Sequence, residues 1–553
     1  MRSWQRAVAS SKNGSNCRLH CAPRTAHLFA TLTSHVKFVP FVVALALSPL
    51  LAAQTRIGKI IVNPLDVYSD PEAKRGAFYQ LADKLHIETH ASVIRKFLLF
   101  HEGDVFRPER LAETERNLRT LHFIKSASVT ATEPHDGIVD VIVTTQDAWS
   151  IAPETNAGNK GGATTYGANI TDTNLLGLGK EVSVQWDKTV DRTRAGIDYQ
   201  DPALNAQFWT AHLAYGSNSD GNDQRVQFRR PFYSFATPWS ADVSYIGFRQ
   251  HDRLYAGGRS FARFQQSHRF VNASFGLALN PNDEFANRFT GGLRFVNDEF
   301  SMLRAHPMLR LPRERDFRYL FVRYDHADND FLKLNFVNKD LRYEDFNLGR
   351  QLSLETAVSP RALGADFNSA FARITAADGK RLGATTFLMP AIAIESRFDR
   401  GMRNAILTTS AGYVHRFDTD HPQATVARVA FNEGWRMDRE MQFFADGVTG
   451  LRAYRIHSFA GNRAFIANLE HRVYFGHEIA QLFSPAVVAF VDTGNATTGG
   501  SLFQLKTDVG VGIRIGLPRT PKNLLRIDAG YALNRDPRGR RGLLITFGSG
   551  QAF

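Results

Sequence analysis

The chain has 553 residues, of which 43% are hydrophobic and 11% aromatic, and its formal net charge is +13. This composition excludes an intrinsically disordered chain. The basic residues are dispersed and no basic cluster is interleaved with aromatic residues, so the sequence predicts no nucleic-acid partner.

Residues 1–53 have the pattern of a secretory signal sequence with a long basic n-region. They contain six Lys or Arg and no Asp or Glu, and they end in the apolar run FVPFVVALALSPLLAA. The run is short for a spanning helix and contains two prolines, so we expect cleavage near Ala53. Cleavage would remove both cysteines, Cys17 and Cys21. We therefore expect an exported chain without disulfides. The long basic region is explained by a misassigned start codon or, alternatively, by an organellar transit sequence.

Residues 57–145 predict a small α+β domain with its sheet on one side. RIGKIIVNPLDVY is typical of a strand, and two short segments after it suit one or two helical turns. The next helix is expected to open at Pro108, with Glu109 in its first turn, because a fixed φ and a negative charge both suit the exposed amides there. Two strands follow. The expected core faces are Leu111, Leu118 and Leu121 on the helix, and Val139, Val141 and Val143 on the last strand.

Residues 148–553 consist of many segments in which apolar and polar residues alternate strictly. In VGVGIRIGL, for example, Val511 and Ile513 oppose Arg514. Alternation alone fits a soluble sandwich as well as a membrane barrel. No apolar run approaches eighteen residues, the polar faces carry charges on strand after strand, and the segments have the length of tilted membrane strands. The sequence therefore predicts a mainly β protein whose C-terminal part is a transmembrane antiparallel β-barrel.

The end of the chain supports the same interpretation. RRGLLITFGSGQAF places Phe547 and the terminal Phe553 in one register. A last strand that stops on an aromatic residue recurs in outer-membrane barrels, in which closure removes every sheet edge. We take Phe547 and Phe553 as a candidate C-terminal barrel signal.

Four segments carry a resemblance to a known family. FLLFHEGDVFRPERLAETERNLRTLHFIKSASV resembles a POTRA domain, and GANITDTNLLGLGKEVSVQW is similar to the start of the barrel in the BamA/TamA superfamily. GLRAY and FVDTGN resemble the two internal signatures of that family's barrel, which is of the bacterial surface antigen type. The resemblance implies a barrel of about 16 strands in a Gram-negative outer membrane, with one POTRA domain in the periplasm.

The resemblance also implies a pair of interacting residues. In the family, the sixth extracellular loop folds into the barrel and presents an arginine to an acidic residue on a strand downstream. Arg452 and Tyr454 occupy the loop motif here, and Phe490, Asp492 and Gly494 occupy the strand motif.

The loop motif departs from the family at two positions. Leu451 replaces valine and Ala453 replaces glycine. The second change removes backbone freedom, so we expect the loop to differ from its relatives first at Ala453.

The alternation agrees with a role for Asp492 inside the barrel. Asp492 shares a face with Phe490 and Val488, and a carboxylate facing lipid would be costly, so this face should line the lumen. A charge-assisted pair with Arg452 would then hold the loop in the barrel. The alternative is that Arg452 is an exposed loop arginine and Asp492 one of many lumenal charges.

The number of segments does not match sixteen strands. Five alternating segments follow GLRAY, as the family implies, but thirteen or fourteen precede it where sixteen strands allow eleven. Either some segments form hairpins in extracellular loops, for which 253–264 and 327–345 are candidates, or the barrel is larger.

The function implied is assembly or insertion of outer-membrane proteins, or translocation of a protein client. The POTRA domain would receive the unfolded client by strand addition, and accessory periplasmic proteins are possible partners. The glycine-rich segment NAGNKGGATTYGANI is either a weakly held edge at the first barrel strand or a simple linker. A passive pore or a surface adhesin is the alternative function.

No sequence motif predicts an enzyme, a metal site or a cofactor. HEIAQ and HEGDV each lack the second histidine of a zinc site, and no G-x-S-x-G occurs. We therefore expect a non-enzymatic protein whose partners are the outer-membrane bilayer and its protein clients.

Overall fold

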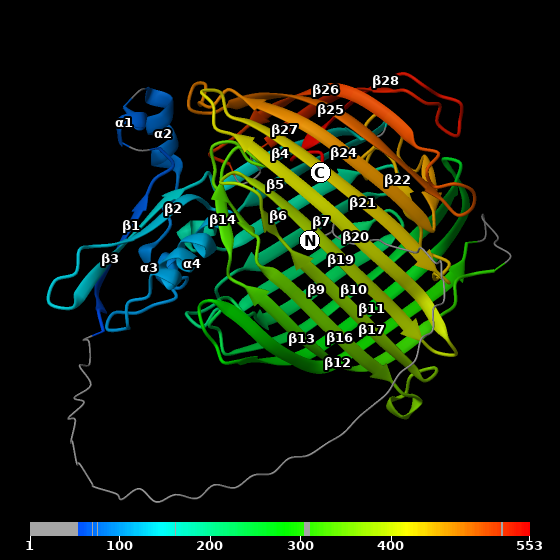
Figure 1. The fold of residues 1–553 in the computed structure, drawn as a ribbon, viewed down its shortest axis with the longest axis horizontal. Helices are drawn as coiled ribbons and strands as arrows, with labels where there is room; N and C mark the ends of the chain where they lie inside the picture. The colour runs from blue at the N-terminus through cyan, green and yellow to red at the C-terminus, as the bar shows by residue number, and fades with distance from the viewer. Residues whose placement is uncertain (1–53, 69, 75, 161, 304–309, 521–523) are drawn as a thin grey trace, which may run out of the picture.

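The structure is a computed structural model that describes residues 54–553, except positions 69, 75, 161, 304–309 and 521–523. The signal sequence predicted for residues 1–53 lies outside the described residues. The described chain forms a small N-terminal domain that sits against one end of a large β-barrel (Figure 1).

The N-terminal domain contains a three-stranded sheet and four helices. The sheet has the order β1 (Arg56–Leu65), β3 (Ile138–Asp147), β2 (Ile124–Ala131), with β1 parallel and β2 antiparallel to β3. The helices are α1 (Asp70–Ala73), α2 (Ala77–Leu85), α3 (Ala91–Arg95) and α4 (Pro108–Arg119). The predicted start of α4 at Pro108 is confirmed, with Glu109 in its first turn. The predicted core residues of the helix and of β3 are buried, which confirms their burial, although Leu121 lies two residues beyond the end of α4.

The barrel is one antiparallel sheet. Its strands in chain order are β4 (Ile151–Lys160), β5 (Ala163–Asp172), β6 (Glu181–Lys188), β7 (Thr193–Asp201), β8 (Thr210–Asn218), β9 (Gly221–Arg230), β10 (Trp239–Ala256), β11 (Arg259–Leu279), β12 (Phe285–Met302), β13 (Arg315–Asp328), β16 (Arg350–Ser359), β17 (Ser369–Asp378), β19 (Thr386–Phe398), β20 (Met402–Phe417), β21 (Gln423–Trp435), β24 (Arg463–Tyr474), β25 (Ser484–Thr497), β26 (Lys506–Gly516), β27 (Leu524–Ala532) and β28 (Leu543–Ser549). The two-residue strand β18 (Lys380–Arg381) adds a short pairing to β19.

The barrel is larger than the sixteen strands that the resemblance implies. The described residues place twenty strands in the ring, not counting β18, and five of them follow the GLRAY segment. The excess lies upstream, because almost every alternating segment there pairs into the ring. Residues 253–264 do pair as a hairpin, as the sequence suggested, but this hairpin is the continuous end of the ring strands β10 and β11.

The ring is weakest between its first and last strands. In the described chain, β28 and β4 meet at one residue pair, Phe547 with Asn159. In contrast, β4 and β5 share ten pairs and β27 and β28 share seven. We call the junction of β28 and β4 the seam.

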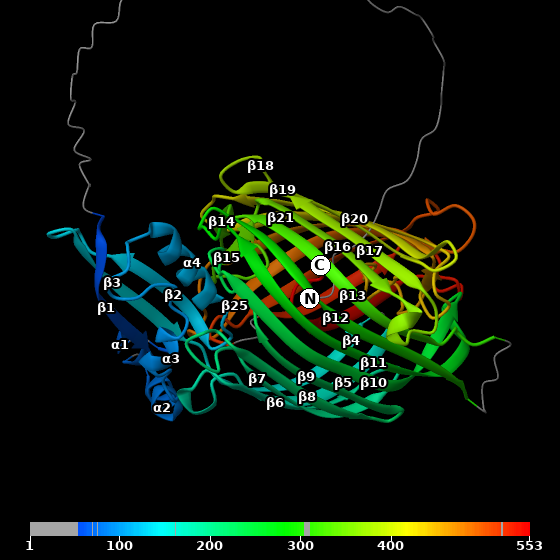
Figure 2. The same cartoon turned by 90° about the horizontal axis from the view of Figure 1, so that it is seen from below.

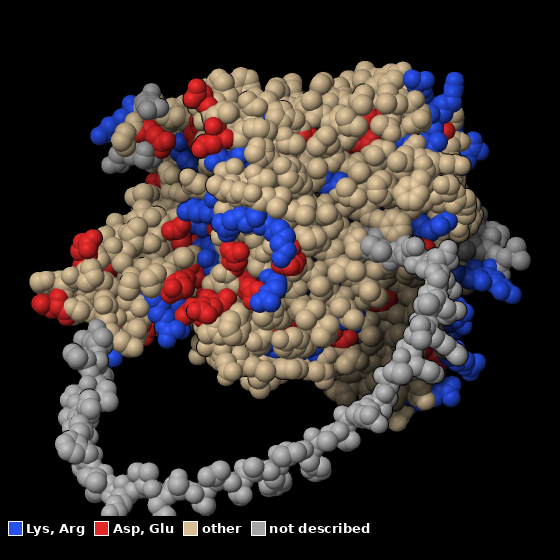
Figure 3. Space-filling model, viewed as in Figure 1, with Lys and Arg blue, Asp and Glu red and all other residues tan. Residues whose placement is uncertain are grey.

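The two faces of the barrel wall differ in polarity. Val511, Ile513 and Leu525 point outward and are 46% to 62% exposed, whereas Arg514 and Asp528 point inward and are fully buried. In Figure 3, charged side chains gather at the two ends of the barrel, and a broad band between them is largely free of charge. No helix in the described part of the chain is long and apolar enough to span a bilayer.

A candidate ion-pair site inside the barrel

The N-terminal domain defines the two ends of the barrel. Only three residues, 148–150, separate β3 from β4, so β4 begins at the end of the barrel that lies next to the domain. We call this the domain end, and successive turns between strands alternate between the opposite, far end and the domain end. By this alternation, residues 436–462 connect β21 to β24 at the far end. We call them the inserted loop. It contains a small hairpin of β22 (Phe443–Ala445) and β23 (Phe459–Gly461).

The inserted loop folds back into the barrel. Its residues Leu451, Arg452, Ala453 and Tyr454 are all buried, and Arg452 is only 3% exposed. Gly450 precedes them with a φ of +140°, a conformation that favours glycine. The loop therefore carries an arginine from the far end into the lumen.

The structure brings Arg452 and Asp492 together. Arg452 donates from Nε to Asp492 Oδ2 at 2.7 Å and from Nη2 to Oδ1 at 3.0 Å, which is a bidentate ion pair. Asn468 Nδ2 donates to the same carboxylate at 2.7 Å and to the carbonyl oxygen of Gly450, also at 2.7 Å. Asp492 thus fixes both the side chain of Arg452 and, through Asn468, the backbone of the loop.

The other motif residues surround this pair. The guanidinium carbon of Arg452 lies 3.4 Å from the ring centroid of Phe490, a cation–π contact. The Tyr454 hydroxyl donates to the carbonyl oxygen of Thr507 at 3.0 Å. Burial raises the pKa of Tyr454 to about 12, so this hydroxyl stays protonated and able to donate. Position 494 has room only for glycine, because a Cβ there would lie 2.4 Å from the carbonyl oxygen of Phe465.

Ala453, where we expected the loop to differ from its relatives, has a matching partner. A Cβ at Gly530 of β27 would lie 3.1 Å from the Cβ of Ala453. The methyl group of Ala453 therefore occupies space that the glycine leaves open. Ala453 does not have a positive φ, so the backbone freedom of glycine is not needed at this position.

Sequence reasoning missed other charged residues around this pair. They lie on β24, β26 and β27 and are all fully buried: Glu470, Arg472, Arg514 and Asp528. Glu470 accepts hydrogen bonds from Arg452 Nη1 and, at 2.7 Å, from Arg472 Nε. Arg514 Nη1 donates to Asp528 at 2.6 Å. The signal that could have found them is the strand alternation, which puts Glu470, Arg472 and Arg514 on polar faces.

The charged groups of this network are buried and ion-paired, but within the described residues Arg472 Nη2 donates no hydrogen bond and Asp528 Oδ2 accepts none. A buried ion pair repays its desolvation only when its hydrogen bonds are satisfied, and removal of one partner leaves an uncompensated charge. The arginines and carboxylates alternate from Asp492 through Arg452 and Glu470 to Arg472. The arrangement can hold the loop in one position, and it offers no exposed group for reaction with a substrate.

A second segment enters the lumen from the domain end. Residues 329–349 connect β13 to β16 and form what we call the inner hairpin, with strands β14 (Phe331–Leu334) and β15 (Glu344–Asn347). The carbonyl oxygen of Val337 accepts hydrogen bonds from Arg472 Nη1 at 2.6 Å and from the Tyr474 hydroxyl at 2.7 Å. Residues 327–345 thus do contain a hairpin, as the sequence suggested, but it enters the lumen from the domain end and adds no strand to the ring.

The inner hairpin packs on the inner wall through an apolar cluster. Its members come from the hairpin, the barrel strands and the chain end: Leu332, Leu334, Phe336, Val337, Leu348, Phe387, Val414, Ala424, Val426, Tyr474 and Ala486, with the partly buried Leu341, Phe346, Met389 and Phe553 against them.

The C-terminal end departs from the predicted last strand. Phe547 lies in β28 and forms the seam pair, but β28 ends at Ser549 and Gly550 has a φ of +75°. The tail then turns inward, where Gln551 contacts Arg514 Nε and the carbonyl oxygen of Asn338. Phe553 packs in the apolar cluster of the inner hairpin, so it does not continue the register of Phe547.

The inner hairpin is also bound to the N-terminal domain. Arg119 at the end of α4 donates to both oxygens of Asp345, at 2.7 and 2.8 Å. Lys333 lies 2.7 Å from Glu115 of the same helix. Figure 2 shows α4 beside β14 and β15 at the domain end, and Figure 1 shows α4 beside β14 from another direction.

The remainder of the domain contacts several turns of the barrel. Arg107 pairs with Asp283 at 2.8 Å. Arg519, between β26 and β27, donates to Glu72 at 2.6 Å and to the carbonyl oxygen of Val67 at 2.7 Å. The domain is therefore fixed to separate parts of the domain end.

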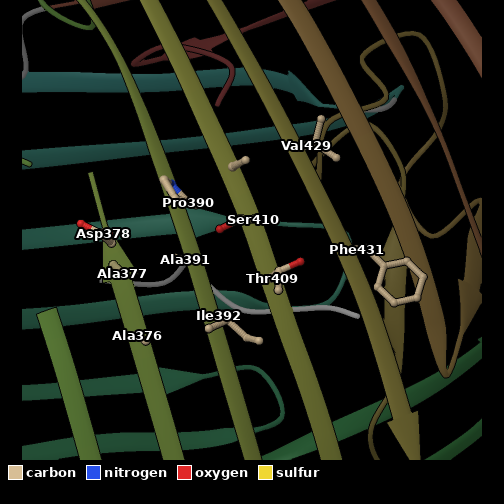
Figure 4. A pocket seen from close by; sticks show the side chains of 11 residues that line it. Ala376, Ala377, Asp378, Pro390, Ala391, Ile392, Thr409, Ser410, Val429 and Phe431 are labelled. Atoms are coloured by element: carbon tan, nitrogen blue, oxygen red, sulfur yellow. The ribbon is translucent and has the colours of Figure 1, made fainter. Parts of the chain in front are cut away.

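A hollow of about 410 Å³ lies elsewhere on the wall, over β17, β19, β20 and β21 (Figure 4). Its lining is mainly small and apolar, and includes Pro390, Ile392 and Val429, with Asp378 as its one ionisable side chain. Such a lining offers no set of polar groups to bind or transform a ligand. Within the described ranges, no group of three or more His, Cys, Asp or Glu could hold a metal ion.

Comparisons with known proteins give structural similarity at low sequence identity. No family model matches the chain, and no curated protein matches it. CdiB from Acinetobacter baumannii is similar, with 13% identity, coverage of 90% of this chain and 74% of that chain, and a TM-score of 0.47. BamA from Haemophilus ducreyi, lacking POTRA domains 1–3, gives 12% identity, 90% and 84% coverage, and a TM-score of 0.37. OccK5 (OpdH) from Pseudomonas aeruginosa gives 8% identity, 72% and 97% coverage, and a TM-score of 0.30.

Proposed function

We propose that this chain is an outer-membrane β-barrel that assists the assembly or insertion of outer-membrane proteins, or the translocation of a protein client. In this proposal the N-terminal domain acts as a periplasmic POTRA domain that receives the client. No reaction is catalysed. The clients are unfolded outer-membrane or secreted proteins, and accessory periplasmic proteins are further partners.

The outer surface of the barrel supports a place in a membrane. Large apolar residues such as Val511 and Leu543 are more than 60% exposed on the outer face, which would be costly in water. In a bilayer, an outward apolar band over polar inner faces is the expected arrangement of a closed barrel. The charge-poor band in Figure 3 is the part of the surface that would contact the lipid chains.

One observation carries the functional proposal: two segments that enter from opposite ends are joined through one buried chain of contacts on the barrel wall. Glu470 accepts from Arg452 of the inserted loop and from Arg472, which in turn binds Val337 of the inner hairpin. A passive pore needs an open lumen, so this arrangement favours a barrel whose lumen opens only when a segment moves.

The seam supports the same function. One residue pair joins β28 to β4, so separation of these strands would break far fewer hydrogen bonds than separation of any neighbouring pair named above. An open seam would present two unpaired strand edges to a client, and exposed edges template strand addition.

The N-terminal domain supports a link between client binding and opening. Its helix α4 binds the inner hairpin through Arg119 and Asp345. A client that displaces the domain would therefore pull on the hairpin that occupies the lumen.

The proposal is tested by reconstitution of the chain in lipid vesicles. We expect low permeability to small ions and faster insertion of an added unfolded outer-membrane barrel than in vesicles without the chain. Matched vesicles with Arg452→Ala should insert the client more slowly. High ion permeability without any effect on insertion would instead favour the passive pore.

A further inference from the structure

An arginine-rich loop lies at the far end of the seam. Residues 533–542 join β27 to β28 and contain four exposed arginines: Arg535, Arg538, Arg540 and Arg541. The one carboxylate of this connection, Asp536, is buried and accepts hydrogen bonds from the backbone N–H groups of Arg538 and Arg540, at 2.9 and 2.8 Å. Asp536 therefore shapes the turn rather than pairing with a guanidinium group.

Three arginines converge on one hollow beside this connection. The hollow has a volume of about 270 Å³, and Arg455, Arg540 and Arg541 line it. Within the described chain, no ion pair joins any of these three guanidinium groups to a carboxylate. The carboxylate of Asp536 also lines the hollow, held by the backbone N–H groups of Arg538 and Arg540. Three guanidinium groups against this one carboxylate leave the hollow with a positive charge. Such a hollow favours an anion with several oxygen acceptors, and phosphate fits the planar donor geometry of arginine.

The hollow is not purely polar. The rest of its lining is small, aromatic or apolar: Ala453, Tyr454, Ala532, Gly542, Leu543 and Leu544, of which Leu543 is 64% exposed. The outer face continues from Leu543 to Ile545, which is 52% exposed, and to Tyr531, whose ring lies 5.9 Å from the Arg541 guanidinium carbon. A basic hollow thus adjoins an apolar outer wall.

We propose that this hollow binds the phosphate group of a membrane lipid, with the lipid's acyl chains along the outer face of β27 and β28. The inference rests on the proposed membrane location of the barrel, but not on its role with protein clients. A lipid fits better than a soluble phosphate compound because the exposed apolar surface leads directly out of the hollow.

The position of the hollow gives the bound lipid a role at the seam. Arg455 belongs to the inserted loop, and its guanidinium carbon lies 3.2 Å from where a Cβ at Gly162, in the β4–β5 turn, would be. Arg540 and Arg541 immediately precede β28. One phosphate held by these arginines would therefore bridge the two sides of the seam.

The test compares lipid binding to the purified full chain by native mass spectrometry. Three ligands are used: a lipid with a phosphomonoester headgroup, the same lipid without its phosphate, and inorganic phosphate. We expect the phosphorylated lipid to bind, and the triple variant Arg455→Gln, Arg540→Gln, Arg541→Gln to bind it at least tenfold more weakly. The control is Arg400→Gln, an exposed arginine at the same end between β19 and β20, which should bind like the parent chain.

Three outcomes would overturn the proposal. They are equal binding of both lipids, unchanged binding in the triple variant, and binding of inorganic phosphate as tightly as the phosphorylated lipid. Folding of each variant is checked by the shift in gel mobility on heating. If the barrel folds and inserts into membranes but does not bind the phosphorylated lipid in preference, this inference is rejected and the proposed function is unaffected. If the chain does not insert into membranes, both are rejected.

Discussion

Arg452 and Arg472 share one carboxylate, that of Glu470, although they belong to different parts of the lumen. Arg452 comes from the inserted loop at the far end. Arg472 binds the inner hairpin, which enters from the domain end. Glu470 and Arg472 therefore connect the two inserted segments. We expect a displacement of one segment to weaken the contacts of the other.

The pair of Arg452 and Asp492 should be energetically coupled. We expect Arg452→Ala and Asp492→Ala each to destabilise the barrel by about 3–5 kcal/mol, because each leaves a buried charge without its partner. The double variant should lose much less than the sum. Urea unfolding followed by gel mobility measures these losses, with Arg439→Ala, an exposed arginine of the same loop, as the control. Additive losses of stability would show that Arg452 and Asp492 do not interact.

The inner hairpin should limit conductance. Replacement of residues 331–347 by a short Gly-Ser turn removes the segment that packs on the inner wall, so single-channel conductance in planar bilayers should rise several-fold. Replacement of the far-end residues 498–504 by a turn of the same kind should change it little. Equal conductance of the hairpin variant and the parent chain would mean that the hairpin does not obstruct the lumen.

The link between α4 and the hairpin should be restored by charge exchange. Arg119→Asp alone places two carboxylates together, so hydrogen exchange of residues 331–347 should become faster. The double variant Arg119→Asp, Asp345→Arg should bring the exchange back toward the parent rate. Arg107→Ala breaks the contact with Asp283 instead and serves as the comparison. Slow exchange in all variants would show that the domain does not hold the hairpin.

The junction of domain and barrel should weaken as the pH rises. Asp147 is fully buried and accepts hydrogen bonds from the backbone N and the hydroxyl of Thr89, and Asn174 of the β5–β6 turn donates to that hydroxyl at 2.8 Å. Burial raises the pKa of Asp147 to about 6, from an ordinary value of 3.8. The folded state therefore holds a proton that the unfolded chain releases. The contribution to stability is complete below pH 3.8 and is lost as the pH rises through about 6.

Asp147→Asn should remove this dependence, because an amide does not titrate. The thermal midpoint of the domain, measured between pH 4 and 7.5, should fall with rising pH in the parent chain and change less in the variant. His86 Nε2 lies 3.8 Å from Asp147 and adds its own titration, so the difference between the two chains is the relevant quantity. Parallel pH profiles would show that Asp147 is charged throughout.

Much of the barrel could be predicted from strand alternation. Period-two patterning assigns Asp492 to the face of Phe490 and away from exposed Val491, and the structure has this arrangement. Alternation does not predict the pairing of Asp492 with Arg452. Arg452 lies forty residues earlier in the chain, in a loop that has no alternating pattern and that folds into the barrel. The expected pair came from the resemblance of GLRAY and FVDTGN to the two family signatures.

The remainder of the site depends on register and on the number of strands. Alternation places Glu470 and Arg514 inside the barrel, but only the pairing of β24 with β25, and of β25 with β26, brings them to Arg452. The inner hairpin has strands of four residues, too short for a clear pattern, and the end of the barrel that it enters depends on how many strands precede it. Phe553 follows the alternation of β28 in sequence, yet Gly550 turns the tail inward.

The central claim is that this barrel serves the assembly or translocation of other proteins. Depletion of the chain in its native cells, followed by quantitative profiling of outer-membrane and secreted proteins, tests it most directly. The account predicts that a defined set of these proteins is lost, and that a copy with Arg452→Ala restores them less well than the parent chain. An unchanged outer-membrane and secreted proteome after depletion would contradict it.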